Sequence, residues 1–502
     1  MYRAYLKILV VISLLISLAY SDESSDSDLD GFNDDLNAFG EEMNISASTD
    51  LKDGFDDLDG FSDIDVSSNL YTNEVDEVAK YSYLDDMSLS GELAFKTAAG
   101  YESHEVEGID YSGINQAQTS LYLQIDTKLS DNWKIRISGD AYYDAIYDIY
   151  SHNDYNKDVL DEYRQQVRLD DTYIQGQLSD NLDLKFGRQV VVWGKSDNIR
   201  VTDVINPTDN RLPGVTDIEY LRLPTTMAKL DYYVGDWDIA MMAIFEPRTS
   251  LNAPAGSEYM PIDTVEISNQ IGLNNPDQVR PIVEEPHTSS GNMQYALAFN
   301  GVFSGWDLSF YVARIFNQDS RSENVVADGA DISNFVYDKI NMAGVAFNTV
   351  LGSWLIKSEA AYLNGLKYST TDDEKDRLDV LFGIEYMGIE DTSMSLELVN
   401  RHILDFDDVM KQAPDSESEN TTQTIVRITR NFMHETLEIT ALANLVGATS
   451  EDGGFGRLWG EYELGDALNF SLGIVVYWGG ENDYLNSIRN NDRIFAELSY
   501  SF

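Results

Sequence analysis

The sequence of 502 residues is strongly acidic and contains no cysteine. Its 34 Lys and Arg residues are outnumbered by 87 Asp and Glu residues, and the formal charge of -53 excludes nucleic acid as a partner, because phosphate binding requires clustered cations. The lack of cysteine excludes disulfides, thiolate metal sites, Cys nucleophiles and a lipid-modified Cys anchor.

Residues 1–21 have the pattern of a secretory signal peptide. Arg3 and Lys7 precede an apolar run from 8 to 18, and the small residues Ala19 and Ser21 stand at the positions that signal peptidase reads. A membrane-anchoring helix is the alternative, but the apolar run is shorter than the roughly 20 residues that span a bilayer. We therefore expect an exported chain.

An acidic segment, residues 22–87, follows the predicted signal peptide. Its first part, residues 22–65, holds 16 acidic residues and one Lys, and it repeats "DLDGF" at 28–32 and 57–61. Such a composition cannot bury a core, so we expect a largely disordered periplasmic segment. It is either a solvated tail or a docking motif for a partner protein.

A calcium loop is a further reading of this acidic segment. Asp26, Asp28, Asp30 and Gly31 match D-x-D-x-D-G, the start of a calcium loop, in which alternating carboxylates converge on one cation. The match stops there, since Asn37 replaces the bidentate Glu at the twelfth position. The three aspartates are a weak metal candidate.

From residue 88 onward, apolar and polar residues alternate with a period of two, which predicts β-strands. About 18 strands are expected, and their starts lie near residues 88, 115, 133, 165, 182, 225, 236, 293, 306, 339, 353, 377, 392, 422, 435, 455, 468 and 493. Short turns alternate with long loops, as in transmembrane barrels. We predict an all-β fold, a transmembrane antiparallel β-barrel over 88–502 with short periplasmic turns and long extracellular loops. A soluble sandwich or propeller is the alternative.

Two long loops are candidates for a constriction inside this barrel. The loop 248–292 holds half of the chain's ten prolines, which suits a folded-in segment, and the loop 194–224 carries mixed charges. Solvated external loops are the alternative for both. The pore candidates are Arg188, Lys195, Arg200, Asp203 and Arg211 around the second loop, with Lys134, Arg136 and Asp140 on the polar inner wall.

Tryptophan positions favour a membrane barrel over a soluble one. Four tryptophans directly follow short turns and three stand near long loops, so we expect two aromatic girdles at the membrane interfaces. The short-turn girdle comprises Trp133, Trp237, Trp306 and Trp354, and the long-loop girdle comprises Trp193, Trp459 and Trp478.

The final strand, "RIFAELSYSF", alternates apolar residues up to a terminal aromatic. It resembles the last strand that the bacterial outer-membrane assembly machinery recognises. Leu498, Tyr500 and Phe502 are the expected assembly signal, and the assembly machinery is an expected partner.

The stretch "LKFGRQVVVWGKSDNIRVTDVINPTDNR" at 184–211, with its continuation "LPGVTDIEYLRLPTTMAKL" at 212–230, resembles the most recognisable block of an uncharacterised family of Gram-negative outer-membrane barrels, the domain of unknown function 1302. The matching positions are Gly187 to Gln189, Trp193-Gly194, Val204 to Pro207 and Leu223-Pro224. The acidic "DGFDDLDGF" is similar to that family as well. The resemblance implies an architecture related to alginate-export-type porins. It also implies association with RND-type exporters and transport of hydrophobic cargo, but no residue role is carried over.

Three functions follow as hypotheses. The first is an outer-membrane channel or conduit that moves hydrophobic or amphipathic cargo together with an RND-type export system, which the acidic segment would contact. The second is a diffusion porin, and the third is a structural or adhesive barrel. No enzymatic motif is found, because the five His residues lack metal spacing and no G-x-S-x-G occurs. No cofactor is expected, and the other partners are outer-membrane lipid and lipopolysaccharide.

Overall fold

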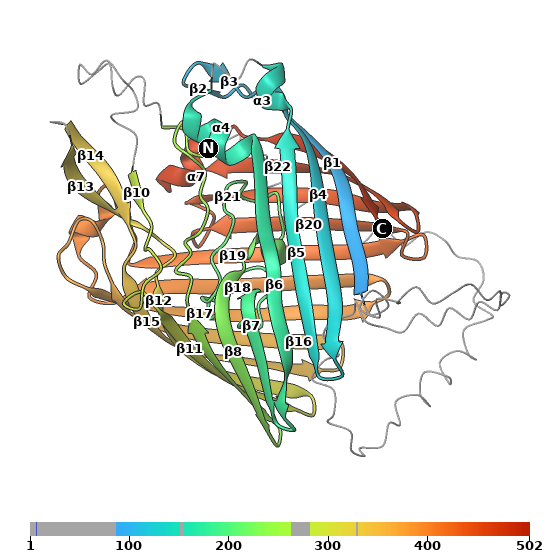
Figure 1. The fold of residues 1–502 in the computed structure, drawn as a ribbon. Helices are drawn as coiled ribbons and strands as arrows, with labels where there is room; N and C mark the ends of the chain where they lie inside the picture. The colour runs from blue at the N-terminus through green and yellow to red at the C-terminus, as the bar shows by residue number, and fades with distance from the viewer. Residues whose placement is uncertain (1–6, 8–86, 151–154, 263–281, 328–329) are drawn as a thin grey trace. The chain divides into compact units, whose positions relative to one another are not determined.

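The computed structural model describes residue 7 and residues 87–150, 155–262, 282–327 and 330–502 (Figure 1). The calcium candidates Asp26, Asp28 and Asp30 lie outside the described residues. The same holds for the acidic segment up to residue 86 and for the predicted signal peptide apart from Lys7.

Eighteen antiparallel strands form one closed sheet (Figure 1). Each barrel strand pairs with the next one along the chain, and β1 pairs with both β4 and the last strand, β23, which closes the ring. The predicted starts lie within two residues of the observed ones, so the fold class is confirmed. The barrel strands are β1 (Met87–Gly100), β4 (Gly113–Ser130), β5 (Trp133–Asp144), β6 (Gln165–Ser179), β7 (Leu182–Gln189), β8 (Thr225–Val234), β9 (Trp237–Ile244), β11 (Gln294–Phe303), β12 (Trp306–Phe316), β15 (Lys339–Leu351), β16 (Trp354–Leu366), β17 (Lys375–Ile389), β18 (Thr392–Ile403), β19 (Asn420–Phe432), β20 (Leu437–Val446), β21 (Gly453–Gly465), β22 (Leu468–Gly479) and β23 (Arg493–Ser501).

The strands alternate between an inward and an outward face. On β12, Tyr311 and Ala313 are buried, whereas their outward neighbours Phe310 and Val312 are 44% and 48% exposed. On β1, Phe95 is 49% exposed while Ala94 is buried. Large apolar side chains exposed around a closed ring of strands are the lipid-facing surface of a membrane barrel.

The two rims of the barrel differ as the sequence predicted. The short-turn rim holds tight turns such as 131–132 and 352–353. The connections that start from the long-loop rim carry the accessory elements, which are β2 (Glu105–Val106), β3 (Ile109–Asp110), α3 (Ile146–Ile149), α4 (Lys157–Tyr163), α5 (Ile218–Leu221), β10 (Ile282–Glu284), β13 (Arg321–Ala327), β14 (Ala330–Val336), η4 (Asp408–Lys411) and α7 (Asp483–Ser487). Figure 1 shows β2, β3, α3 and α4 gathered at one end of the barrel. Within the described ranges, no helix has the length and apolar character needed to cross a membrane.

The tryptophans near the short-turn rim have the surroundings expected of a girdle. Trp306 and Trp354 are 39% and 46% exposed, and Trp133 and Trp237 are partly exposed. Trp306 stacks on Phe303 with 4.2 Å between the ring centroids. Their location at a membrane interface stays a prediction.

The long-loop girdle of Trp193, Trp459 and Trp478 is wrong, because all three rings are buried, at 4%, 3% and 2% exposure. Trp193 stacks on Tyr311 with 4.6 Å between the ring centroids, and the Arg457 guanidinium lies 3.7 Å from the ring centre of Trp459. Nearness to a long loop says nothing about which face of the strand carries a side chain. For Trp459 the alternation with Arg457 and Glu461 already indicated the inward face.

The last strand presents the expected apolar face. Leu498, Tyr500 and Phe502 are 42%, 49% and 51% exposed. The backbone of Phe502 exchanges two hydrogen bonds of 2.8 and 2.9 Å with Gly91, which joins the chain end to β1. Recognition of this strand by the assembly machinery stays a prediction.

Closure between β1 and β23 can be tested in this Cys-free chain. Ala94 and Ser499 face each other across the seam. We expect the Ala94→Cys, Ser499→Cys variant to form a disulfide, because directly opposed strand residues lie within the Cα separation that a disulfide spans. Non-reducing gel mobility is the measurement. The pair Ala94→Cys, Thr440→Cys, whose strands are not neighbours, is the control; equal crosslinking in both pairs would contradict this closure.

Candidate functional site

The connection between β7 and β8, residues 190–224, crosses the barrel interior and is called the lumenal loop below. It bonds to side chains of β16 and β18, which lie six and eight strands further around the ring of 18. Strands nine apart would be directly opposite, so the loop reaches the far wall. The structure therefore favours the folded-in arrangement over a solvated external loop.

Glu359 of β16 anchors the first part of the lumenal loop. One carboxylate oxygen accepts hydrogen bonds from the backbone N–H groups of Lys195 and Ser196, at 2.6 and 2.8 Å. The other accepts from the N–H and the hydroxyl of Thr202, at 3.1 and 2.7 Å. Glu359 is 2% exposed, so these four donors compensate a buried carboxylate.

Glu397 of β18 provides a second anchor. It is 1% exposed and accepts from the Ser196 hydroxyl at 2.8 Å and from the Asp197 N–H at 3.1 Å. The buried ammonium of Lys357 pairs with Asp197 of the loop and, at 3.3 Å, with Glu385 of the wall. Residues 195–202, the loop tip, are thus held by Glu359 and Lys357 of β16 and by Glu397 of β18.

The underside of the lumenal loop is apolar and packs on the inner wall. Five side chains contact buried residues that include Met227, Met242 and Leu363. Each fully buried side chain of this kind is worth about 1.5–3 kcal/mol. The five loop side chains are Val191, Trp193, Ile199, Val201 and Ile205.

Gly194 is required where the loop meets its anchor. Its φ is +88°, and a Cβ there would lie 2.7 Å from a carboxylate oxygen of Glu359. Its N–H donates to the Tyr311 hydroxyl at 3.2 Å. The positive φ and the close approach of Glu359 explain why glycine follows Trp193.

Asn206 ties the two ends of the loop together. Its side-chain oxygen accepts from the Val191 N–H at 2.8 Å, and its amide donates to the Leu223 carbonyl at 2.8 Å and to the Gln189 carbonyl at 3.3 Å. Next to it, Asp203 accepts from Arg200 at 3.1 Å and Arg222 at 2.8 Å. These hydrogen bonds therefore hold the start and the end of the lumenal loop together.

The second half of the loop bonds to the remaining wall. Arg211 pairs with Asp209 at 2.6 Å and donates to the Glu162 carbonyl at 2.6 Å and the Tyr142 hydroxyl at 3.2 Å. Asp217 lies between Arg427 of β19, at 3.0 Å, and Arg457 of β21, at 2.7 Å. These contacts extend the anchoring to both sides of the lumen.

The other predicted pore residues are spread over the barrel. Arg136 pairs with Asp126 at 2.8 Å, and Asp140 pairs with Arg168 at 2.8 Å. Arg188 pairs with Glu246 at the end of β7, so the structure does not bring it to the loop tip. Lys195 does reach the barrel wall: its ammonium pairs with Asp307 of β12 at 3.2 Å, and its backbone N–H donates to Glu359 of β16. A role of these residues in permeation stays a prediction.

Sequence reasoning missed Glu359, Glu397 and Lys357. Each is a charged residue at an inward position of its strand, which is ordinary for a wet barrel. Nothing in the sequence showed that a loop more than 150 residues earlier would bond to them.

The other long loop also turns to the wall in its described part. Tyr259 is fully buried, and its hydroxyl lies 3.1 Å from that of Tyr477 on β22. Glu258 pairs with Arg493 of β23 at 2.6 Å. Residues 263–281, with Pro276 and Pro281, lie outside the described residues.

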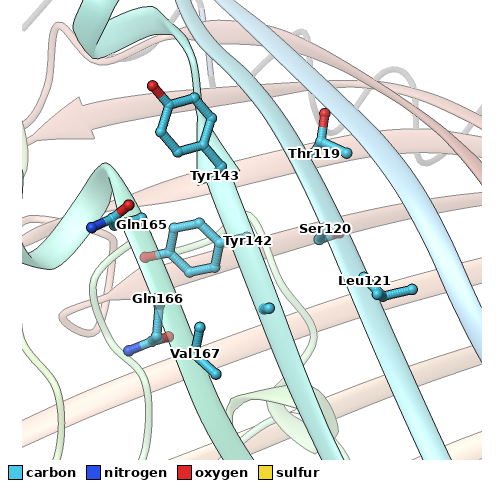
Figure 2. A pocket seen from close by; sticks show the side chains of 9 residues that line it. Thr119, Ser120, Leu121, Tyr142, Tyr143, Gln165, Gln166 and Val167 are labelled. Atoms are coloured by element: carbon cyan, nitrogen blue, oxygen red, sulfur yellow. The ribbon is translucent and has the colours of Figure 1, made fainter.

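A shallow hollow of about 500 Å³ is lined by residues of β4, β5 and β6 (Figure 2). Among its lining residues, Val167 is 88%, Tyr143 44% and Leu121 37% exposed. These three side chains stand at outward positions, so this hollow belongs to the lipid-facing surface and not to the lumen.

Comparison with known proteins places the chain in a family and gives its fold relatives. The family model described as "Protein of unknown function (DUF1302)" matches residues 113–502. The barrel is similar to OccK5 (OpdH) of Pseudomonas aeruginosa, with 9% identity, 84% of this chain and 99% of that chain covered, and a TM-score of 0.46. It is similar to OmpT of Vibrio cholerae, with 10% identity, coverage of 83% and 99%, and a TM-score of 0.40. Among curated proteins, none matches this sequence.

The anchoring role of Glu359 gives a first prediction for the loop. We expect Glu359→Gln to loosen residues 195–202 by about 1.5–3 kcal/mol, because hydrogen bonds to a charge are lost and the new amide NH₂ faces other donors. Hydrogen exchange of the Lys195, Ser196 and Thr202 amides should then accelerate by roughly 10- to 100-fold. Glu390→Gln, in an exposed short turn, is the control. Unchanged exchange in Glu359→Gln would show that the carboxylate does not hold the loop.

Glu417, in the loop 404–419 on the long-loop rim, gives a pH prediction. Burial raises the pKa of Glu417 to about 7, while Arg377 lowers it and Asp319 raises it. The pKa of a Glu in the unfolded chain is about 4.3, so between about pH 4.3 and about 7 the folded loop binds this proton more tightly than the unfolded chain does. The resulting contribution to stability is fully present below about pH 4.3 and is lost as the pH rises through about 7.

The measurement for Glu417 is the rate of thermolysin cleavage within 404–419 at pH 6 and pH 8. We expect the wild-type rate, divided by that of Glu417→Gln, to rise with pH, because the glutamine cannot become charged. A ratio that is constant or falls with pH would refute the assignment.

Proposed function

The chain belongs to the family described as Protein of unknown function (DUF1302), and we propose that it is an outer-membrane channel in which solutes diffuse past the lumenal loop. The observation that carries the proposal is the anchoring of this loop across the lumen by Glu359 and Glu397. A barrel of 18 strands is wide enough for an aqueous interior, and a loop fixed across it sets the width of the passage.

The charge distribution of the inner wall supports a wet passage. Lys134, Arg136 and Asp140 of β5 stand at inward positions on one side. The apolar cluster in which the underside of the loop packs lies on other strands, β8 to β21. The inward positions of β4 to β7 lie outside this cluster and form a polar part of the wall.

A conduit for hydrophobic cargo, working with an RND-type export system, is the second candidate. The apolar inner wall favours it, because movement of the lumenal loop would expose Met227, Met242 and Leu363 to the lumen. The acidic segment would be the contact to a periplasmic component, since β1 begins at the short-turn rim.

Single-channel conductance of the refolded full-length protein in a planar bilayer tests the channel. We expect steady conductance, which rises several-fold when residues 196–203 are replaced by a short Gly-Ser linker, because the part of the loop that spans the lumen is removed. Silence of the wild type with conductance of the variant would mean a plugged conduit. Silence of both would end the channel proposal, provided that the Ala94→Cys, Ser499→Cys crosslink shows a closed barrel.

Deletion of residues 22–65 separates the two candidates in cells. Solute uptake through a diffusion channel should persist in the deletion strain. Export of a hydrophobic cargo through a coupled system should fail, because its periplasmic contact would be lost. A variant in which the same segment is scrambled, keeping its charge, controls for composition.

A further inference from the structure

A row of lysines lies on the inner wall of β4 to β8. The strand register places Lys128 opposite Lys134, Lys134 opposite Gln175, Gln175 opposite Lys185, and Lys185 opposite Lys229. This lysine row takes four of the fifteen lysines of a chain whose formal charge is -53. Directly opposed residues share one face of a sheet, so all four point the same way.

That face is the lumen. Positions of the opposite parity are outward, since Ile137 and Phe186 are 46% and 47% exposed. Lys185 lies over the ring of Tyr173, a residue that is 4% exposed, with 3.8 Å between the ammonium and the ring centre.

The row costs stability in the empty barrel. Like charges directly opposite on neighbouring strands are destabilising, and this occurs twice in the row. One nearby carboxylate compensates part of this cost, because Lys229 pairs with Asp231 at 2.9 Å, whereas Asp126 pairs with Arg136 at 2.8 Å.

Two lysines of the row lack a partner acid. In the described part of the chain, Lys128 and Lys185 form no ion pair. The largest electrostatic effects on Lys185 come from one anion, Asp171, and from the cations Lys229, Arg136 and Lys134. The center of the row therefore has an excess of positive charge.

Directly across the ring, nine strands from β4 and β6, β16 and β18 supply Glu359 and Glu397 to the loop beside Asp197, and Lys357 offsets part of this negative charge. On the lysine row, by contrast, ammonium groups stand directly opposite one another.

We propose that the lysine row is a binding site for small multivalent anions, solutes that carry two or more carboxylate or phosphate groups. Neighbouring strands are about 4.8 Å apart, so the paired lysines of β4 and β5, and those of β7 and β8, each present two ammonium groups to one dianion. The inference rests on the proposed channel function and names the class of solute that it passes.

The test measures ion selectivity and binding separately. The reversal potential in a KCl gradient should show anion preference in the wild type. The variant Lys128→Gln, Lys134→Gln, Lys185→Gln, Lys229→Gln should lose at least several-fold of the chloride-to-potassium permeability ratio. Lys157→Gln, on α4 with a side chain 84% exposed, is the control and should match the wild type.

Inorganic pyrophosphate and succinate are the binding probes, followed by isothermal titration of the refolded full-length protein. Heat released by pyrophosphate alone would restrict the site to phosphates, and heat from both would indicate any dianion. Binding lost in the fourfold variant but kept in Lys157→Gln sustains the site even if the barrel does not conduct. Equal selectivity and equal binding in all three proteins, with intact barrels, would overturn it.

Discussion

Two buried carboxylates on the barrel wall, Glu359 and Glu397, are the constraint on which the arrangement of the lumen depends. A loop that crosses a barrel carries backbone N–H groups away from bulk water, and each unpaired one would cost free energy. A buried carboxylate without donors would cost still more. In this barrel the loop donates six hydrogen bonds to the two carboxylates, so each side satisfies the other.

Packing of the lumenal loop against the wall also explains why the inner wall is not uniformly polar. β9 reads "WDIAMMAI", with the buried Ala240, Met242 and Ile244 between outward residues that are also apolar. A wet lumen would demand polar residues at those positions. Because the lumenal loop covers this part of the wall, the strand is apolar on both faces, and the polar residues are left for β4 to β8.

Strand positions were predictable from the sequence, since alternation and turn residues act locally. The folding-in of residues 190–224 was predicted only as one of two alternatives, although apolar runs such as that of β9 carried a signal for it. Glu359 and Glu397 could not be predicted as anchors, because the sequence of a strand with an inward Glu is the same whether that side chain faces water or a loop. The prediction of a long-loop girdle was wrong for a related reason. When a loop fills part of the lumen, a large aromatic ring can pack inside the barrel as well as at a membrane interface.

The anchoring contacts join parts of the chain that are far apart, which constrains the order of folding. The bonds from Thr202 to Glu359 and from Ser196 to Glu397 span 157 and 201 residues. Contacts of such long range form slowly, because their loop-closure entropy is lost before they stabilise anything. The lumenal loop therefore docks only after β16 to β18 have taken their places, and until then its apolar underside is a surface that a periplasmic chaperone would have to shield.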